Sequence, residues 1–499
     1  MNLSLLIIIP VLAAAGIAFS GNRNMARTVA LGGAVVQLLL SIALMFLYRE
    51  AHHANPSAGF YFESTMAWFP SLGINYHIGI DGITIAMILL TACVVLAGIL
   101  VSWNMEEQPK SFFFLLTLLS AGAYGFFISL DLFLMFFFLE VAVIPKYLLI
   151  GIWGSGKKEY SANKLALMLM GGSALVLVGL LGLCYHAPIQ SEGFSLQSLS
   201  KLQIPVDVQL IFFPFLFVGF GIFTAIFPFH TWVPDGHSSA PTAASMFLAG
   251  ISMKLGGYGC LRVAAYLMPE AAHYYSGYII ALAAIAILYG AFATMMQKDL
   301  KYMNAYSSVS HCGFVLLGIG MLTPASISGA VIQMVSHGLM TALFFAAIGM
   351  LYERTHTRTI AELGGLLKVM PFISTVFFIA GLCSLGLPGF SGFVAEMTVF
   401  VGSWQQPDTM YRVATIVACM SIVVTAVYIL RATGRSLMGP LGKDSYSGLK
   451  DALWNEKSAA VLLIAAILVI GITPFYINHL IDPATQAIME NVNRYISLN

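Results

Sequence analysis

Charged residues are scarce in this sequence. Asp, Glu, Lys and Arg make up 9% of its 499 residues, against about 25% in a soluble domain. So little charge is not enough to coat the roughly three soluble domains that the length would otherwise suggest. The 23 basic and 22 acidic residues nearly cancel, which leaves no basic surface for nucleic acid. With 59% hydrophobic residues, the composition is that of a polytopic membrane protein.

Cysteine is also rare, and no two cysteines form a C-x-x-C pair. The six residues lie in or beside apolar runs, so we interpret them as packing thiols rather than iron–sulfur or zinc ligands. The apolar segment 2–20 lacks a basic start and a cleavage site. We therefore expect it to be retained as the first membrane helix.

Long apolar runs are what the sequence has in abundance. A helix needs about 20 apolar residues to cross a bilayer, and about fourteen runs qualify. The predicted spans are 2–20, 26–47, 80–102, 111–129, 131–153, 162–185, 208–229, 240–266, 275–296, 301–321, 326–351, 371–401, 411–433 and 458–482. We expect an all-α protein with short loops and no separate soluble catalytic domain.

Lys and Arg are distributed unevenly between the two sides of these predicted spans. Sixteen of the 23 fall in one set of loops and five in the other, while Lys146 and Lys254 lie inside helices. Basic loops stay in the cytoplasm. The bias predicts that both termini lie outside, which requires an even number of spans.

Helix-breaking residues occur in two spans that are five spans apart. The seventh span contains Pro214 and Pro228, and the twelfth contains Gly386, Pro388 and Gly389. Broken helices in corresponding positions of two halves are typical of transport sites. This spacing predicts two inverted five-helix repeats, spans 4–8 and 9–13.

Four regions follow from this division of the spans. They are three N-terminal helices in 1–110, the first repeat in 111–266, the second repeat in 275–433, and a cytoplasmic loop with a final helix in 434–499.

Ionisable side chains within the spans are the candidate functional residues. A charge at the bilayer centre costs at least about 2.5–3.5 kcal/mol, so it needs a functional reason. Acids, amines and imidazoles along a membrane interior can pass a proton between them. The predicted proton path contains Glu140, Lys146, Lys254, His311, His337 and Glu396.

Each of these residues also has a purely structural interpretation. Glu140 and Lys254 would form a static ion pair, Glu396 would cap a broken helix, and the two histidines would be bonded core residues. Lys146 would extend its amine toward an interface. Asp81, in Gly-Ile-Asp-Gly-Ile-Thr, is expected to cap a helix start.

Several stretches of the sequence match a known family. They are GIDGITIAMILL (79–90), FFFLEVAVIPKYLLIGIWG (136–154), FPFHTWVPDGHSSAPTAASMFLAGISMKLGGYG (227–259), KDLKYMNAYSSVSHCGFV (298–315), VIQMVSHGLMTALFF (331–345), LYERTHTRTIAELGGL (351–366) and LGLPGFSGFVAEM (385–397). The chain resembles the NuoM-type antiporter-like subunits of bacterial respiratory complex I, the proton-pumping NADH:quinone oxidoreductase. The resemblance covers essentially the whole chain.

The resemblance implies fourteen spans with two inverted repeats and a position in the membrane arm of the bacterial inner membrane. It implies that this chain binds no cofactor, and that FMN, iron–sulfur clusters and quinone belong to partner subunits. The neighbours would be lipid and flanking antiporter-like subunits. The chain lacks the long lateral helix of the terminal subunit type, so we expect a middle subunit.

The resemblance also implies roles for individual residues. Glu140 matches the essential glutamate of the fifth span, and Lys254 matches the central lysine of the eighth. His311 and His337 match histidines of the central axis. Glu396 matches the glutamate of the twelfth span, at the proton exit or at the contact with the next subunit.

One position departs from the family pattern. The family has a lysine on the seventh span, and counting back from the Pro-Phe-His triplet places Phe223 there. Lys146 is an extra cation in the fifth span, and we hypothesise that it replaces the missing partner of Glu140. On a straight helix the two residues would lie about 9 Å apart along the axis and about 240° apart around it. A bend at Pro145 would change both values.

Three alternative functions remain at this stage. A subunit of a multi-subunit Na⁺/H⁺ antiporter shares the same core, and so does the membrane arm of a membrane-bound hydrogenase. A purely structural scaffold is disfavoured, because it would gain nothing from burying charges in the membrane.

Overall fold

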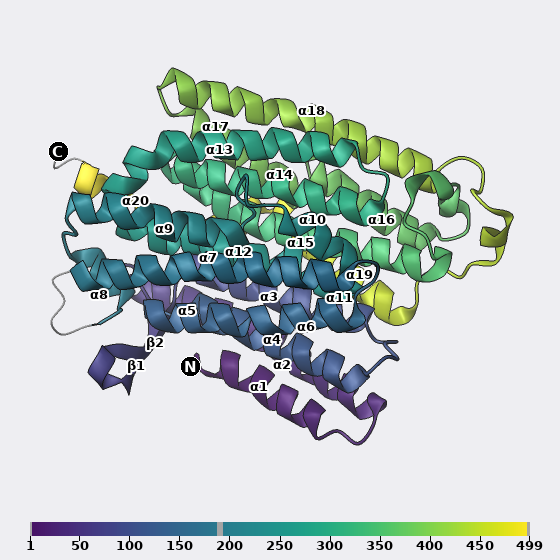
Figure 1. The fold of residues 1–499 in the computed structure, drawn as a ribbon, viewed down its shortest axis with the longest axis horizontal. Helices are drawn as coiled ribbons and strands as arrows, with labels where there is room; N and C mark the ends of the chain where they lie inside the picture. The colour runs from purple at the N-terminus through teal and green to yellow at the C-terminus, as the bar shows by residue number, and fades with distance from the viewer. Residues whose placement is uncertain (1, 187–192, 497–499) are drawn as a thin grey trace.

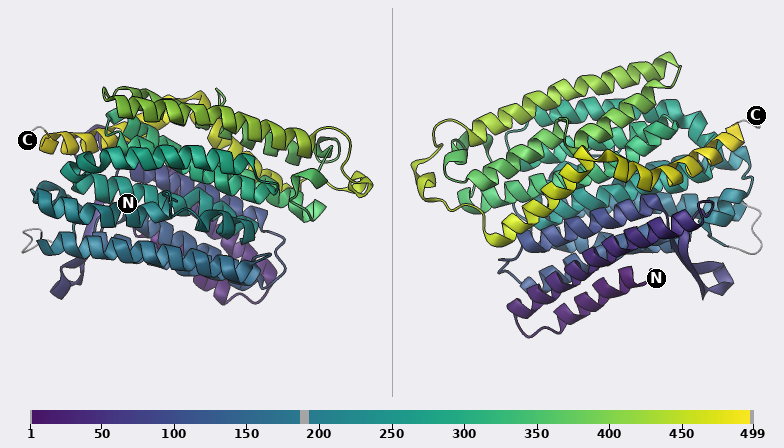
Figure 2. Two further views of the ribbon diagram at one scale, coloured as in Figure 1. Left: turned by 45° about the horizontal axis from the view of Figure 1, so that its top comes forward. Right: turned by 180° about the vertical axis from the view of Figure 1, so that it is seen from behind.

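The computed structural model describes residues 2–186 and 193–496. Its helices lie side by side along the long axis of the molecule (Figure 1). Helix α1 lies at one edge and α18 at the opposite edge, as the right-hand view of Figure 2 also shows. In that view α19 and α20 follow the boundary between the N-terminal helices and the second half of the chain.

The first half of the described chain contains α1 (Leu5–Ala18), α2 (Arg23–Ala54), β1 (Tyr61–Phe69), η1 (Pro70–Leu72), β2 (Ile74–Ile80), α3 (Gly82–Val101), α4 (Pro109–Ile128), α5 (Leu132–Val141), α6 (Val143–Trp153), α7 (Lys158–His186), α8 (Leu196–Lys201), α9 (Val206–Phe223), α10 (Trp232–Ser239), α11 (Thr242–Phe247), η2 (Leu248–Ser252), α12 (Met253–Gly259) and η3 (Cys260–Ala265). Segments η2 and η3 are π-helical.

The second half contains α13 (Pro269–Met295), α14 (Leu300–Gly320), α15 (Pro324–Thr355), η4 (Ile360–Glu362), η5 (Leu366–Lys368), α16 (Pro371–Ser384), α17 (Ser391–Trp404), α18 (Thr409–Leu437), η6 (Asp444–Gly448), α19 (Trp454–Ile472) and α20 (Pro474–Ile496).

The helices have the length and composition of membrane spans. Among the described residues, ten are long and apolar enough to cross a bilayer, and α1 and α16 are shorter apolar helices. Helix α15 is buried along nearly its whole length, whereas peripheral helices expose large apolar side chains such as Leu167 and Val423. The polytopic membrane class is therefore confirmed.

The fold is not wholly helical, which corrects the all-α expectation. Strands β1 and β2 form an antiparallel hairpin, with Tyr61 paired to Ile80 and Ala67 to Asn75. The hairpin projects from one end of the bundle (Figure 1). It occupies the polar stretch between the second and third predicted spans, where aromatic and β-branched residues favour strands over helix.

The predicted helix breaks are present in both spans. Helix α9 ends at Phe223 and α10 begins at Trp232, so the chain is non-helical around Pro228. Helices α16 and α17 are separated by 385–390, which contains Pro388. Pro214, in contrast, lies inside the continuous α9.

Three further interruptions are present, and only the one near Pro145 was anticipated. The fifth span divides into α5 and α6 at Ala142, three residues before Pro145, whose ring is incompatible with the preceding helical turn. The eighth span contains π segments on both sides of α12. The expected last span, 458–482, is instead α19 and α20, which separate at Pro474.

Two aspartates make the same set of backbone contacts in the two halves of the chain. Asp131 caps α5 by accepting hydrogen bonds from the amides two and three residues ahead, and Asp299 caps α14 in the same way. Asp131 forms an isolated antiparallel β-bridge with Ser195, and Asp299 forms one with Thr359. Helices α5 and α14 begin at opposite ends of the bundle (Figure 1).

Candidate functional site

Lys254 on α12 is fully enclosed by the bundle. It is 1% exposed, and its Nζ lies 2.7 Å from Nδ1 of His337 on α15. The amine also donates to the carbonyl of Ala249, five residues earlier in the π segment η2. A π turn frees a carbonyl from the usual helical ladder, and such turns are frequent at functional sites. The local geometry thus gives the buried ammonium a backbone acceptor as well as an imidazole.

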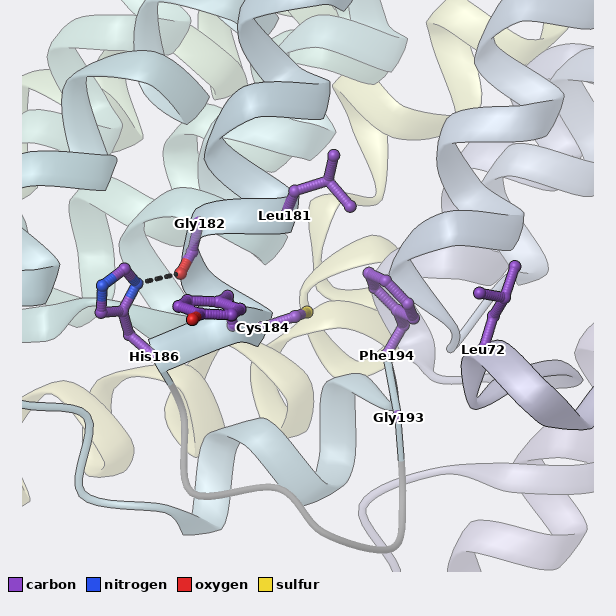
Figure 3. Close-up of a pocket in the computed structure, with 8 residues that line it drawn as sticks. Leu72, Leu181, Gly182, Cys184, His186, Gly193 and Phe194 are labelled. Carbon is purple, nitrogen blue, oxygen red and sulfur yellow. Dashed lines mark hydrogen bonds between the residues drawn. The ribbon is translucent and has the colours of Figure 1, made fainter.

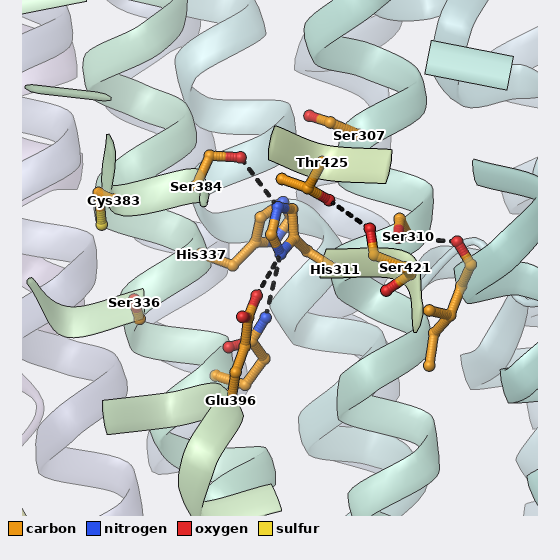
Figure 4. Close-up of polar contacts among 12 residues, drawn as sticks. Ser307, Ser310, His311, Ser336, His337, Cys383, Ser384, Glu396, Ser421 and Thr425 are labelled. Carbon is orange, nitrogen blue, oxygen red and sulfur yellow. Dashed lines mark hydrogen bonds and ion pairs between the residues drawn. The ribbon is translucent and has the colours of Figure 1, made fainter. Parts of the chain in front are cut away.

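His337 lies between Lys254 and His311 on α14 and contacts both residues. The two imidazole rings are stacked with centroids 5.4 Å apart (Figure 4). His311 Nε2 lies 3.0 Å from the Ser384 hydroxyl, and its Nδ1 lies 3.4 Å from Oε1 of Glu396. The Gln333 amide donates to the same Nδ1 at 3.3 Å. The carboxylate favours a protonated Nδ1 and the amide donor an unprotonated one, so both states of this ring have a partner.

Glu396 is held at this position by the break between α16 and α17. It lies on the second turn of α17 and is 5% exposed. Gly386 in the break has φ of +71°, and a Cβ there would lie 2.6 Å from Oε2 of Glu396. Glycine therefore serves two purposes, because it adopts the left-handed backbone and leaves room for the carboxylate.

Four of the six predicted site residues are brought together in this way. The order of contacts is Lys254, His337, His311 and Glu396, from α12, α15, α14 and α17. We call these four residues the central row. Among the structural interpretations, the static ion pair of Lys254 with Glu140 is absent from the described structure, and Glu396 faces His311 without capping α17. The hydrogen bond between His311 and Ser384 agrees with the interpretation of a bonded core histidine.

Glu140 and Lys146 lie apart from the central row. Lys146 is 1% exposed, and its Nζ has no hydrogen-bond partner among the described residues. This burial rules out the interpretation in which Lys146 reaches an interface. Oε1 of Glu140 is likewise buried without a partner. No ion pair within 4.0 Å joins the two residues in the described structure, so the expected direct contact is absent.

The position of the Lys146 amine is nevertheless specific. Its Nζ lies 5.8 Å from the centre of the Phe223 ring, at the last residue of α9. The cation on α6 thus approaches the residue at which the family pattern places a lysine.

Sequence reasoning missed two buried basic residues beside the central row. His237 on α10 is fully buried and stacks on Phe345, and neither ring nitrogen has a hydrogen-bond partner in the part of the chain that the structure describes. Lys301 is 5% exposed and donates to the Ala240 carbonyl at 2.6 Å. Both Lys301 and Lys254 lie within electrostatic range of His237. His237 belongs to the W-x-P-D-x-H pattern of residues 232–237, and Lys301 is the first residue of the predicted span 301–321, where a basic residue is expected at the membrane surface.

Arg262 also differs from its predicted place. The count of basic residues includes it with the outer loops because it falls near the end of the predicted span 240–266, but it is buried in η3 and forms an ion pair with Asp81. Asp81 caps α3 as expected, accepting from the amide of Thr84 at 2.9 Å. A paired arginine inside the bundle is consistent with the cost of burying an unpaired charge.

A pocket at the end of α7, of about 540 Å³, is separate from these groups (Figure 3). Leu72, Leu181 and Phe194 contribute apolar side chains to its lining. Its imidazole, His186, bonds to the carbonyl of Gly182. None of the six predicted site residues lines it.

Comparisons with known proteins give concordant results. A protein-family model described as "NADH:quinone oxidoreductase/Mrp antiporter, TM" matches residues 129–425. The chain is 37% identical to NAD(P)H-quinone oxidoreductase chain 4 1 of Synechococcus sp. (strain JA-2-3B'a(2-13)), over 97% of this chain and 92% of the relative. It is 35% identical to chain 4 2 of Thermosynechococcus vestitus, over 98% and 92%.

Solved structures show the same architecture. A chain of respiratory complex I from Thermus thermophilus with bound NADH superposes with a TM-score of 0.89 at 27% identity, covering 98% of this chain and 99% of that one. A chain of the Mrp complex from Dietzia sp. DQ12-45-1b gives a TM-score of 0.84 at 19% identity, covering 98% of both, which shows a shared fold alone.

Proposed function

Because the chain belongs to the NADH:quinone oxidoreductase/Mrp antiporter membrane family, we propose that it is a proton-translocating membrane-arm subunit of respiratory complex I. Relatives named as chain 4 of NAD(P)H-quinone oxidoreductase match it over nearly their full length. The observation that carries the proposal is the central row, in which an amine, two imidazoles and a carboxylate make successive contacts in the bundle interior.

The central row passes a proton by successive changes of charge. The Lys254 ammonium donates toward Nδ1 of His337, 2.7 Å away. This transfer leaves Lys254 as a neutral amine and His337 as the cation, and the positive charge is then attracted through His311 toward the Glu396 carboxylate, an effect that is strong at low dielectric. In the described structure no hydrogen bond joins the two stacked histidine rings, so this step requires ring rotation or a bridging water.

Glu140 and Lys146 form the second ionisable pair of the proposed path. The proposal is supported by the buried, unpartnered Oε1 of Glu140 and Nζ of Lys146. It is also supported by the approach of Nζ to Phe223, because there Lys146 supplies the cation that the family pattern expects from position 223. Redox energy released in partner subunits would alter the charge of this pair and thereby that of the central row.

The redox chemistry belongs to other subunits in this proposal. FMN, iron–sulfur clusters and quinone are held by partner subunits, and antiporter-like subunits and lipid flank this chain in the membrane. The match to a chain of a solved respiratory complex I supports such partners.

The proposal includes fourteen membrane spans, to which α8, α10 and α20 do not belong. Beyond the ten long helices, the further four are α1, the composite α11–η3, α14, and the pair α16–α17. Helix α1 is apolar but only 14 residues long, and breaks or buried polar residues explain why the other three lack a long, uniformly apolar helix. The basic loops support outer-side termini in a bacterial inner membrane.

Inverted repeats at 111–266 and 275–433 complete the proposed architecture. The matched caps and β-bridges of Asp131 and Asp299 support them, since the two motifs share one pattern and lie at opposite ends of the bundle.

The test is purification of the assembled complex through a tag on this chain. We expect NADH:quinone activity with flavin and iron–sulfur absorbance. A colourless preparation that is inactive with NADH and contains only membrane subunits would contradict the proposal and favour an Na⁺/H⁺ antiporter. In the active complex, Glu140→Gln is expected to abolish NADH-driven proton pumping, with the exposed Glu106→Gln as the matched control.

A further inference from the structure

A cavity of about 1030 Å³ lies where the end of α2 meets the junction of α19 and α20. These segments are more than four hundred residues apart in the chain. None of the six predicted site residues lines the cavity.

The outer part of this cavity is basic. Arg49 and His53 lie four residues apart on α2 and therefore share one face of the helix, and His479 faces the same cavity from α20. In the described structure Arg49 has no carboxylate within ion-pair distance. The one carboxylate in the lining, Asp482, accepts a hydrogen bond from Ser328 at 3.1 Å.

The inner part of the cavity is apolar. On α2, Met45 and Phe46 precede Arg49 by about one helical turn toward the bundle centre. Val469 of α19 and Phe475 of α20 line the opposite wall. Phe46, Val469 and Phe475 are each about half exposed, so their apolar surface is open to a ligand.

This arrangement favours one class of ligand. The apolar stretch of α2 ends at Tyr48, so Arg49 and His53 lie at the level where lipid headgroups begin. A free anion would use the basic residues but leave the apolar walls uncovered. A phospholipid satisfies both parts, because its phosphate and its acyl chains are joined in the same order along the membrane normal.

We infer that this cavity binds an anionic phospholipid, with its phosphate at Arg49 and His53 and its acyl chains between Phe46 and Val469. The site would bind one lipid at the boundary between the N-terminal helices and α19–α20. It neither uses nor requires the central row.

The test uses the assembled complex in native membranes and phosphatidylglycerol with a photoreactive acyl chain. We expect light-induced cross-links on peptides within 45–53 and 469–486, identified by mass spectrometry. The double variant Arg49→Gln/His53→Gln should reduce this labelling at least tenfold. Arg435→Gln, an exposed arginine outside this cavity, should leave it unchanged.

Several outcomes would overturn the inference. Equal labelling by a photoreactive phosphatidylcholine would show that the site does not distinguish anionic from zwitterionic headgroups. Equal labelling of the double variant and the unmodified protein would show that Arg49 and His53 do not bind the lipid phosphate. Suppression of the labelling by millimolar inorganic phosphate would indicate a free anion site, and absence of labelling with cross-links to another subunit would show that protein covers the face.

Discussion

Exchanging the cation between α6 and α9 tests the most unusual part of the proposed path. Lys146→Met removes the buried ammonium, Phe223→Lys adds one at the position it faces, and the double variant moves the charge from one helix to the other. The Nζ of Lys146 now lies 5.8 Å from the centre of the Phe223 ring. The side chains at position 146 on α6 and position 223 on α9 therefore occupy neighbouring space in the bundle.

The expected magnitudes follow from this geometry. Two ammonium groups about 6 Å apart repel by about 3 kcal/mol at an effective dielectric constant of about 20. The single variant Phe223→Lys should therefore be destabilised and poorly active, and adding Lys146→Met should relieve this repulsion. An unpaired charge in the membrane interior costs at least about 2.5–3.5 kcal/mol, so Lys146→Met alone should raise the unfolding midpoint.

Activity should change in the opposite direction to stability. Removing a positioned proton-transfer group costs about a hundredfold or more in rate. Lys146→Met should therefore nearly abolish NADH-driven proton uptake in inverted membrane vesicles, followed by quenching of a pH-sensitive dye. The double variant should recover a large part of it. NADH oxidation with an artificial acceptor reports assembly and should be unchanged throughout.

Two results would refute the reasoning. Normal pumping by Lys146→Met would show that this amine is not on the path. An assembled double variant no more active than Lys146→Met would show that the charge is not interchangeable between the two helices.

Three further predictions concern other parts of the molecule. Gly386→Ala should impair proton pumping, because the added Cβ would lie 2.6 Å from Oε2 of Glu396. Gly389→Ala imposes a similar left-handed backbone strain but has open space around it, so this variant should pump normally. Equal defects in the two variants would contradict this prediction. Asp131→Ala and Asp299→Ala should each lower the free energy of unfolding by about 1 kcal/mol, because each removes a helix cap. Thermal unfolding measures this loss, and a loss in only one variant would argue against equivalent roles of the two aspartates. The hydrogen bond from His77 holds the pKa of Glu63 below its ordinary 4.5. The hairpin should therefore be stable above pH 4.5 and loosen as the pH falls through the lowered pKa, which would be seen as faster hydrogen exchange at 61–80. Glu63→Gln should remove this pH dependence, and a variant that keeps it would contradict the assignment.

Much of the architecture was predictable because apolar length and helix breakers are local properties of a sequence. The break near Pro228 and the one near Pro388 follow from single residues whose backbone geometry excludes a continuous helix. The hairpin was missed because span counting treats a polar stretch as a loop, although aromatic and β-branched residues over 61–80 carried a strand signal.

The candidate site was predictable in its residues but not in its connections. Buried charges stand out in apolar runs, so Lys254 and Glu396 were found. Which residues meet depends on packing between helices far apart in sequence, so the stacking of His311 on His337 had no sequence signal. Arg262 lies near the end of the predicted span 240–266, and its burial depends on the packing of η3 and on its ion pair with Asp81, which composition does not reveal.

The two π segments have a mechanical consequence for Lys254. Segments η2 and η3 lie immediately before and after α12, so the lysine sits on a short α-helical piece with a widened turn at each end. When such a widened turn shifts along a helix by one residue, the residue that it passes turns by about 100° around the helix axis while the rest of the span keeps its place. Lys254 lies two residues after η2, so a shift of this widened turn by two residues would redirect its amine without moving the helices that surround it.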